Sequence, residues 1–141
     1  MPEQAYAGDV SAREAWDMLS SEENAVLVDC RTTAEWSFVG IADLDSVGKA
    51  PVMAEWQSFP SMAVDPAFAD ALRDKGVTPE SAVIFMCRSG VRSKAAAVEM
   101  TGHGYGRCYN LAGGFEGPLD ESGHRGAVDG WKSADLPWRQ S

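Results

Sequence analysis

The sequence predicts an α/β fold with a mainly parallel central sheet and helices on both faces. Two continuous apolar runs, residues 25–30 and 82–87, are rich in β-branched residues and typical of strands buried on both sides. Helical segments alternate with these runs, as in sheets whose parallel strands are joined by helices. The second run ends at Cys87 and leads into a helical segment. Cys87 therefore lies at the carboxyl end of a strand, where such sheets bind ligands.

The helices can be predicted from their capping residues and spacing. Ser11 is followed three residues later by Glu14, a capping box that predicts a helix over about 11–21. A second helix is predicted over 65–76, because Pro66 suits the first helical turn and Gly76 suits the C-terminal cap.

The later part of the chain continues the alternation. The alanine-rich stretch 90–104 predicts a helix, and 107–111 predicts a third, short strand. Residues 39–64 and 113–130 show no sustained period and are expected to be long loops, which either wall a pocket or cover sheet edges. Since no repeat or linker divides the chain, residues 1–141 are predicted to form one domain.

Composition and charge limit the partners. The chain has 141 residues and a net charge of −9, which would repel nucleic acid and anionic membranes. The first ten residues, "MPEQAYAGDV", lack the basic start and apolar stretch of a secretory signal. Because of the net charge, we expect neither nucleic acid nor a membrane as partner.

The cysteines and histidines argue against a disulfide framework and a metal site. Cys30, Cys87 and Cys108 are odd in number and widely spaced, so a reducing compartment, most simply the cytoplasm, is expected. His103 and His124 stand in glycine-rich surroundings without metal-ligand spacing. No metal and no cofactor are predicted.

The stretch "FMCRSGVRSKAAA" carries the candidate chemistry. A thiol reacts as its thiolate, and the pKa of a cysteine at a helix N-terminus beside arginines is lowered by the helix dipole and the positive charges. Cys87 is placed in this way and is the predicted nucleophile. The residues after it can curl so that their backbone N–H groups form an anion-binding nest, with Gly90 permitting the curl. The predicted anion-binding loop consists of Arg88, Ser89, Gly90, Val91, Arg92 and Ser93.

Each part of this stretch also has a structural interpretation. Free cysteines are often small buried hydrophobes, and a basic helix start is often only a solvated surface. A cysteine combined with two arginines, a glycine and a helix start favours the catalytic interpretation.

The motifs of this chain resemble those of the rhodanese-like sulfurtransferases. "CRSGVR" at 87–92 matches their active-site loop, and "LVDCRTTAEW" matches a strand that ends in D-x-R before a glutamate and an aromatic residue. "NLAGGF", then Trp131 and "ADLPW", is similar to a third hallmark, so the resemblance covers about 9–138. Many members have "G-H-I-P-G-A" after the D-x-R segment, where this chain has the longer "SFVGIADLDSVGKAPVMAEW". The resemblance therefore does not define the pocket rim or the identity of the substrate.

The resemblance implies a sulfurtransferase that works through a Cys87 persulfide. Its partners would be a small anionic sulfur donor, such as thiosulfate or a persulfide, and a thiol or other nucleophilic acceptor. Arg88 and Arg92 would bind the donor's oxyanion, and Ser89 or Ser93 would add a hydrogen bond. Asp29, Arg31 and Glu35 are expected to have structural roles, such as a strand-end ion pair.

Three alternatives remain open. A rhodanese-like persulfide carrier or regulatory binding module has the same fold. Cysteine-based phosphatases and arsenate reductases place five residues between cysteine and arginine, whereas Cys87 and Arg92 are separated by four. A redox role would need a second thiol beside Cys87. Cys30 ends the neighbouring predicted strand, but Cys30 and Cys108 are both interpreted as structural.

Overall fold

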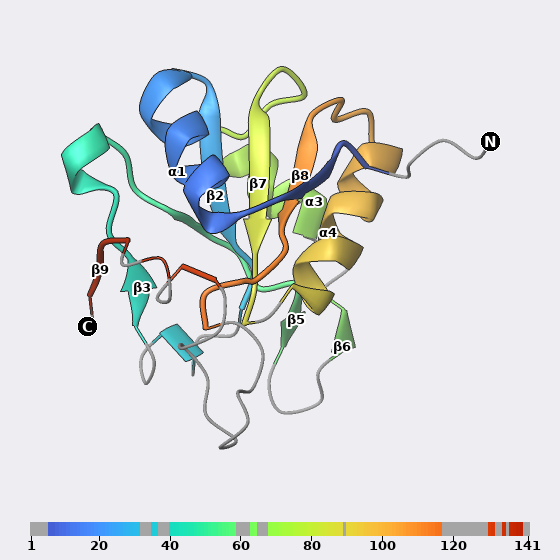
Figure 1. Cartoon of the computed structure of the whole chain (residues 1–141). Coiled ribbons are helices and arrows are strands. Elements are labelled where there is room, and N and C mark those ends of the chain that lie inside the picture. The colour runs from blue at the N-terminus through green and yellow to red at the C-terminus, as the bar shows by residue number, and fades with distance from the viewer. Residues whose placement is uncertain are drawn as a thin grey trace.

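The computed structural model has a five-stranded, wholly parallel central sheet (Figure 1). The structure describes residues 6–31, 35–36, 40–58, 63–64, 68–88, 90–116, 130–131, 134 and 136–139. The strand order is β1-β8-β7-β2-β4. The bounds are β1 (Gly8–Val10), β8 (Cys108–Leu111), β7 (Ala82–Met86), β2 (Ala25–Asp29) and β4 (Val52–Met53). The predicted α/β class with a mainly parallel sheet is confirmed.

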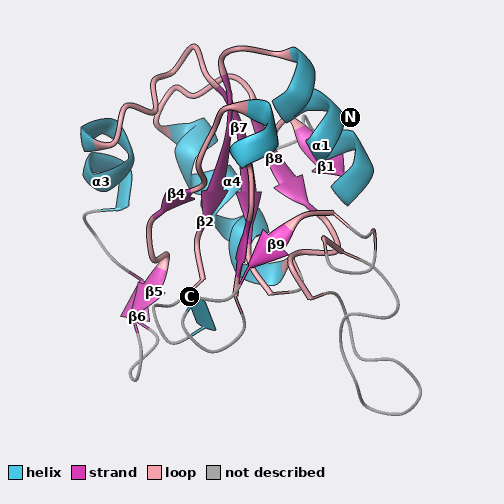
Figure 2. Cartoon of the chain, turned by 90° about the vertical axis from the view of Figure 1, so that its left-hand side faces the viewer, coloured by secondary structure: helices cyan, strands magenta, loops and turns pink. Residues whose placement is uncertain are grey.

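Helices cover both faces of this sheet. Helix α1 (Ala12–Ser21) packs on one face, and α3 (Phe68–Asp74) and α4 (Val91–Gly102) pack on the other. Figure 2 shows α1 and α3 on opposite sides of the strands. None of the helices within the described residues is long and apolar enough to cross a membrane.

The buried strands supply both hydrophobic cores through the two-residue period of β structure. In β7, Ile84 and Met86 belong to the core under α1, whereas Val83 and Phe85 belong to the core under α3 and α4. All five residues of β7 are buried. A strand buried on both faces has no polar alternation, which is why the sequence shows one continuous apolar run.

The predicted capping box is present at the start of α1. Ser11 Oγ accepts a hydrogen bond from Glu14 N at 3.0 Å, and Glu14 Oε1 accepts one from Ser11 N at 2.9 Å. These two bonds satisfy backbone donors that the first helical turn leaves free. The helix ends at Ser21 as predicted and begins at Ala12, one residue after the predicted start, because Ser11 is its N-cap.

The prediction of a structureless loop over 39–64 is wrong for much of that segment. It contains β3 (Ile41–Ala42), the 3₁₀ helix η1 (Asp45–Val47), β4, β5 (Gln57–Ser58) and β6 (Ala63–Val64). β3 pairs with β9 (Trp138–Arg139), and β5 pairs with β6, both antiparallel. Strands of two residues are too short to show a period in the sequence.

The other boundaries differ by a few residues or fall outside the described part. The strands predicted over 25–30 and 82–87 end one residue earlier, and β1 was not predicted. The helix predicted over 65–76 is observed as α3, and residues 65–67 lie outside the described residues. In the segment 113–130, Gly113–Glu116 form turns, and 117–129 lie outside the description.

Candidate active site

Cys87 lies directly after β7, and α4 begins four residues later, at Val91. The Gly90 amide donates a hydrogen bond to Cys87 Sγ at 3.1 Å, so the loop folds back over the sulfur. The Cys87 residue is only 1% exposed. The N-terminal end of a helix, with its partial positive charge, therefore lies beside a recessed sulfur atom.

Gly90 is the N-cap of α4 and has a φ of +109°, which an L-residue rarely adopts. A Cβ atom at this position would collide with the carbonyl oxygen of Ala112. Glycine is therefore needed both for the backbone angle and for the close approach of the two segments. The sequence interpretation of Gly90 anticipated the angle but not the contact with Ala112.

The turn that follows β8 holds the cysteine loop in place. Phe115 N donates to Cys87 O at 2.8 Å, and Glu116 N donates to Arg88 O at 3.0 Å. Trp131 N in turn donates to Gly114 O at 2.8 Å. Phe115, the last residue of "NLAGGF", thus fixes Cys87, and Glu116, the residue after that segment, fixes Arg88.

Arg92 forms a two-point ion pair with Glu35. Its Nη1 lies 2.6 Å from Glu35 Oε1, and its Nη2 lies 2.9 Å from Glu35 Oε2. The two side chains are 16% and 19% exposed. This hydrogen bonding raises the pKa of Arg92 above its ordinary value, against the opposing effect of burial. The guanidinium is permanently charged, and its charge is balanced by a carboxylate.

Ser93 connects the sulfur to a buried chain of polar side chains. Ser93 Oγ lies 3.3 Å from Cys87 Sγ and 2.5 Å from Asn110 Oδ1. Asn110 Nδ2 donates to Asp9 Oδ1 at 3.0 Å. Ser93 is fully buried and Asn110 is 3% exposed. The chain therefore runs from the sulfur to β1, at the edge of the sheet.

Asp29 and Arg31 form the predicted structural ion pair at the end of β2. Arg31 Nη2 lies 2.7 Å from Asp29 Oδ2 and donates to Gly40 O at 2.6 Å, and both charged side chains are fully buried. The guanidinium also lies over the Phe115 ring, 4.3 Å from its centroid. The Asp29–Arg31 pair therefore supports Phe115, whose backbone amide donates to Cys87 O.

Cys30 and Cys108 are buried thiols that behave as small core residues. Cys30 Sγ donates to Met86 O at 3.3 Å, and burial and the neighbouring Cys87 raise its pKa well above the ordinary value. Burial raises the pKa of Cys108 to about 11. Both thiols are therefore protonated at neutral pH and are weak nucleophiles.

The structure brings together part of the predicted loop. The Gly90 amide and the Ser93 hydroxyl both lie next to the Cys87 sulfur, and Val91 is the first residue of α4. Arg88 is exposed, and Ser89 lies outside the described residues.

Sequence reasoning missed Asn110 and Asp9 as parts of the site, and it missed the ion pair between Glu35 and Arg92. The one available signal was a polar residue, Asn110, within the otherwise apolar and aromatic strand "CYNL". Buried polar side chains are normally hydrogen-bonded, so such a residue indicates a partner.

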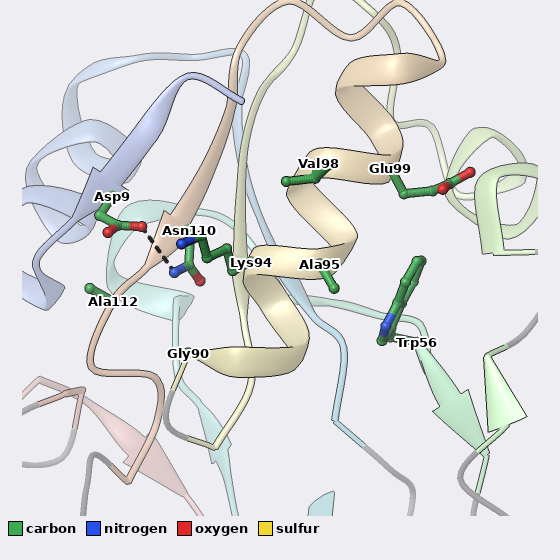
Figure 3. Close-up of a pocket in the computed structure, with 9 residues that line it drawn as sticks. All are labelled: Asp9, Trp56, Gly90, Lys94, Ala95, Val98, Glu99, Asn110 and Ala112. Atoms are coloured by element: carbon green, nitrogen blue, oxygen red, sulfur yellow. Dashed lines mark hydrogen bonds between the residues drawn. The ribbon is translucent and has the colours of Figure 1, made fainter. Parts of the chain in front are cut away.

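A pocket of about 750 Å³ lies against the first turns of α4 (Figure 3). Gly90, Lys94 and Val98 line it from α4, and Trp56 lines it from the segment after β4. Asn110 also lines the pocket, and the figure shows its amide pointing toward Asp9. The outer end of the polar chain is therefore at a pocket wall.

The parallel sheet and the cysteine loop between β7 and α4 define an α/β protein of the rhodanese-like fold class. Residues 7–141 match the STR4 middle domain family, and the chain belongs to that family. The expected rhodanese-like fold is thus confirmed, with the STR4 middle domain as the matching family.

Two solved structures show this similarity. The Rv0390 protein of M. tuberculosis is 47% identical, with a TM-score of 0.87, and the match covers 96% of this chain and 99% of that one. The polysulfide-sulfur transferase homodimer of Wolinella succinogenes is 20% identical, with a TM-score of 0.65, covering 97% of this chain and 80% of that one.

Two sequence relatives add to the comparison. Protein RC0915 of Rickettsia conorii is 38% identical over 131 residues, covering 93% of this chain and 96% of the relative. The rhodanese-like domain-containing protein 4 of Arabidopsis thaliana, a chloroplastic protein, is 26% identical over 132 residues. That match covers 93% of this chain and 25% of the Arabidopsis protein.

Proposed function

We propose that the protein is a sulfurtransferase that carries a sulfane sulfur as a persulfide on Cys87. The observation that carries this proposal is the 3.1 Å hydrogen bond from Gly90 N to Cys87 Sγ at the N-terminus of α4. Backbone donors fixed in this way stabilise negative charge on or next to the sulfur without reorganising. The fold shared with a polysulfide-sulfur transferase supports this class of reaction.

In the first step, the Cys87 thiolate attacks the terminal sulfur of a donor such as thiosulfate. A new S–S bond forms, the S–S bond of thiosulfate breaks, and sulfite leaves with the electron pair. The product is a Cys87 persulfide whose outer sulfur carries the negative charge. Because Cys87 is only 1% exposed, the best donors are those with a protruding terminal sulfur.

In the second step, a nucleophilic acceptor such as a thiolate or cyanide attacks the outer sulfur. The bond to Cys87 Sγ breaks and the Cys87 thiolate leaves, which completes ordinary covalent catalysis. Arg88, which is exposed, would attract the anionic donor. Arg92 would contribute through the charge it keeps while paired with Glu35.

The chemistry of the chain also supports the partners and the setting that we propose. A net charge of −9 disfavours nucleic acid and anionic membranes. The exposed Arg88 supports a small anionic donor, and the reaction requires a thiol or other nucleophilic acceptor. The unpaired Cys30, Cys87 and Cys108 support a reducing setting such as the cytoplasm.

The proposal can be tested by intact mass spectrometry of the reduced protein after incubation with thiosulfate. The native protein and Cys108→Ser should each gain one sulfur, about 32 Da, whereas Cys87→Ser should gain none. Cys108→Ser is the matched control, because it also removes a buried thiol, but Cys108 pairs with Val83 near the start of β7 and not with the loop. Release of the sulfur to cyanide, measured as thiocyanate, then distinguishes turnover from mere carriage.

Two outcomes would contradict the proposal. The first is an equal gain of sulfur in Cys87→Ser. The second is a folded, reduced native protein that gains no sulfur from thiosulfate or from polysulfide. A native protein that gains sulfur but forms no thiocyanate would instead favour the persulfide-carrier alternative.

A further inference from the structure

The chain of hydrogen bonds behind Cys87 has a fixed direction, which begins at Asp9. An ionised carboxylate can only accept hydrogen bonds, and Asp9 Oδ1 accepts from Tyr6 Oη at 2.7 Å and from Asn110 Nδ2 at 3.0 Å. The amide nitrogen of Asn110 must therefore face Asp9. Its amide oxygen, which only accepts, then faces Ser93 (the Asn110–Asp9 bond is drawn in Figure 3).

This orientation determines where the Ser93 hydroxyl proton points. A hydroxyl has one proton, and Ser93 Oγ has two neighbours, Asn110 Oδ1 at 2.5 Å and Cys87 Sγ at 3.3 Å. If the proton turned to the sulfur, two oxygen acceptors would face each other at 2.5 Å. The proton therefore belongs to Asn110, and a lone pair of Ser93 faces Cys87 Sγ.

We propose that Asp9 and Asn110 are positioning residues that hold the Ser93 hydroxyl as a hydrogen-bond acceptor toward Cys87 Sγ. This inference rests on the proposed sulfur transfer and adds Asp9 and Asn110, to which the sequence motifs assign no role. An acceptor facing Sγ disfavours negative charge on that atom. It has much less effect on charge one atom further out, on the outer sulfur of a persulfide.

The consequence is a bias toward the sulfur-loaded state. In the resting thiolate the charge is on Sγ, opposite the lone pair of Ser93. In the persulfide the charge has moved to the outer sulfur, and Sγ is a neutral, divalent atom. The orientation of one hydroxyl group thus shifts the equilibrium with the donor toward the persulfide.

Other charged groups surround the same site and have to be separated from this effect. Among the described residues, the titratable and charged groups near Cys87 and the polar chain include Tyr6, Asp9, Asp29, Cys30, Glu35, Arg88, Arg92, Lys94 and Glu99. Asp9→Asn removes one of these charges, but Asn110→Ala removes none. A comparison of the two variants therefore separates hydroxyl orientation from simple charge removal.

The test is the pH dependence of Cys87 alkylation by iodoacetamide, followed by peptide mass mapping. Asn110→Ala removes the acceptor of the Ser93 proton, so Ser93 can donate to Cys87 Sγ. Asp9→Asn allows the Asn110 amide to turn and donate to Ser93 Oγ, which again leaves the Ser93 proton for Cys87 Sγ. A hydrogen bond to a charged group corresponds to about a tenfold change, so the profile of each variant should move to lower pH by about one unit. In a Ser93→Ala background, Asn110→Ala should produce no shift.

The outcomes divide clearly. An unchanged profile in Asn110→Ala, or the same shift when Ser93 is absent, would overturn the proposal, because a merely structural role gives either result. If Asn110→Ala does not fold, Asp9→Asn decides in the same way. The shift of the pH profile from the native protein to Asp9→Asn then has to be larger than the shift from Ser93→Ala to Asp9→Asn/Ser93→Ala.

A second readout connects the chain to sulfur transfer. At a fixed ratio of thiosulfate to sulfite, the persulfide fraction of Asn110→Ala should correspond to an equilibrium constant about tenfold lower than that of the native protein. If the native protein takes up no sulfur, the proposed function fails, while the alkylation profiles still decide whether Asp9 and Asn110 position Ser93.

Discussion

Replacing Gly90 with alanine tests whether the loop geometry supports the chemistry. Two effects add at this position. A non-glycine residue at φ +109° is strained by roughly 1–3 kcal/mol. The new Cβ would also collide with Ala112 O, so the loop has to move and lose the hydrogen bond to Cys87 Sγ, at a cost of about 1–3 kcal/mol. The free energy of unfolding should therefore fall by about 2–6 kcal/mol.

Gly104→Ala is the matched control. Gly104 has a similar φ of +96°, but apart from its two chain neighbours no atom of the described residues lies within 4 Å of the position its Cβ would take. This variant is strained in the same way without any collision, so its unfolding free energy should fall by only about 1–3 kcal/mol. In a domain of this size each kcal/mol lowers Tm by roughly 3 °C.

The assay combines thermal unfolding with the rate of persulfide formation from thiosulfate. Gly90→Ala should melt at least several degrees below Gly104→Ala and should form the persulfide at least tenfold more slowly. Gly104→Ala should form it at the native rate. Equal melting temperatures and equal rates for the two variants would refute the argument that the Ala112 contact and the Gly90 amide shape the site.

Two further predictions concern ion pairs. Glu35→Gln leaves Arg92 without a balancing charge, so the KM for thiosulfate should fall severalfold while the unfolding free energy decreases by about 1–3 kcal/mol. A higher KM in steady-state assays would contradict this prediction and would mean that Glu35 holds Arg92 in the position that binds the donor. Hydrogen bonds from Arg107 lower the pKa of Glu22 below its ordinary value of 4.5. That stabilisation is complete above about pH 4.5 and is lost as the pH falls through the lower folded-state pKa. The stability advantage of the native protein over Glu22→Gln, measured by urea unfolding, should therefore disappear in acid. An advantage that stays constant with pH would contradict this assignment.

The three inner strands of the central sheet, β8, β7 and β2, and the helices could be predicted because their signals are local. A continuous apolar run gives a strand buried on both faces, and the capping box fixes the start of α1 to the residue. β3, β4, β5, β6 and β9 could not be predicted, because each has only two residues. Pairs such as β3 with β9 join segments that are far apart in the sequence. Such strands are defined by their partners and not by their own composition.

The same distinction holds for the candidate site, whose local part could be predicted and whose contacts with distant residues could not. Cys87, Gly90 and the start of α4 belong to one continuous stretch, so their arrangement follows from local rules about helix ends and positive φ. The partners of that stretch come from elsewhere. Glu35 is 57 residues from Arg92, and Asp9 is 101 residues from Asn110. The polar Asn110 indicates that it has a partner, but nothing in the local sequence identifies Asp9 or Glu35 as the residue that makes the contact.

These distant partners change the electrostatic interpretation of the loop. From the sequence, two arginines beside a cysteine suggest a strongly positive site. In the structure the charge of Arg92 is balanced by Glu35, and Arg88 is exposed, where water screens its charge. The fixed contribution at the sulfur then comes mainly from the Gly90 amide and the N-terminal end of α4. Backbone dipoles of this kind act over a short range and favour one charged atom at a defined position. The outer sulfur of a persulfide is a single charged atom and meets that requirement.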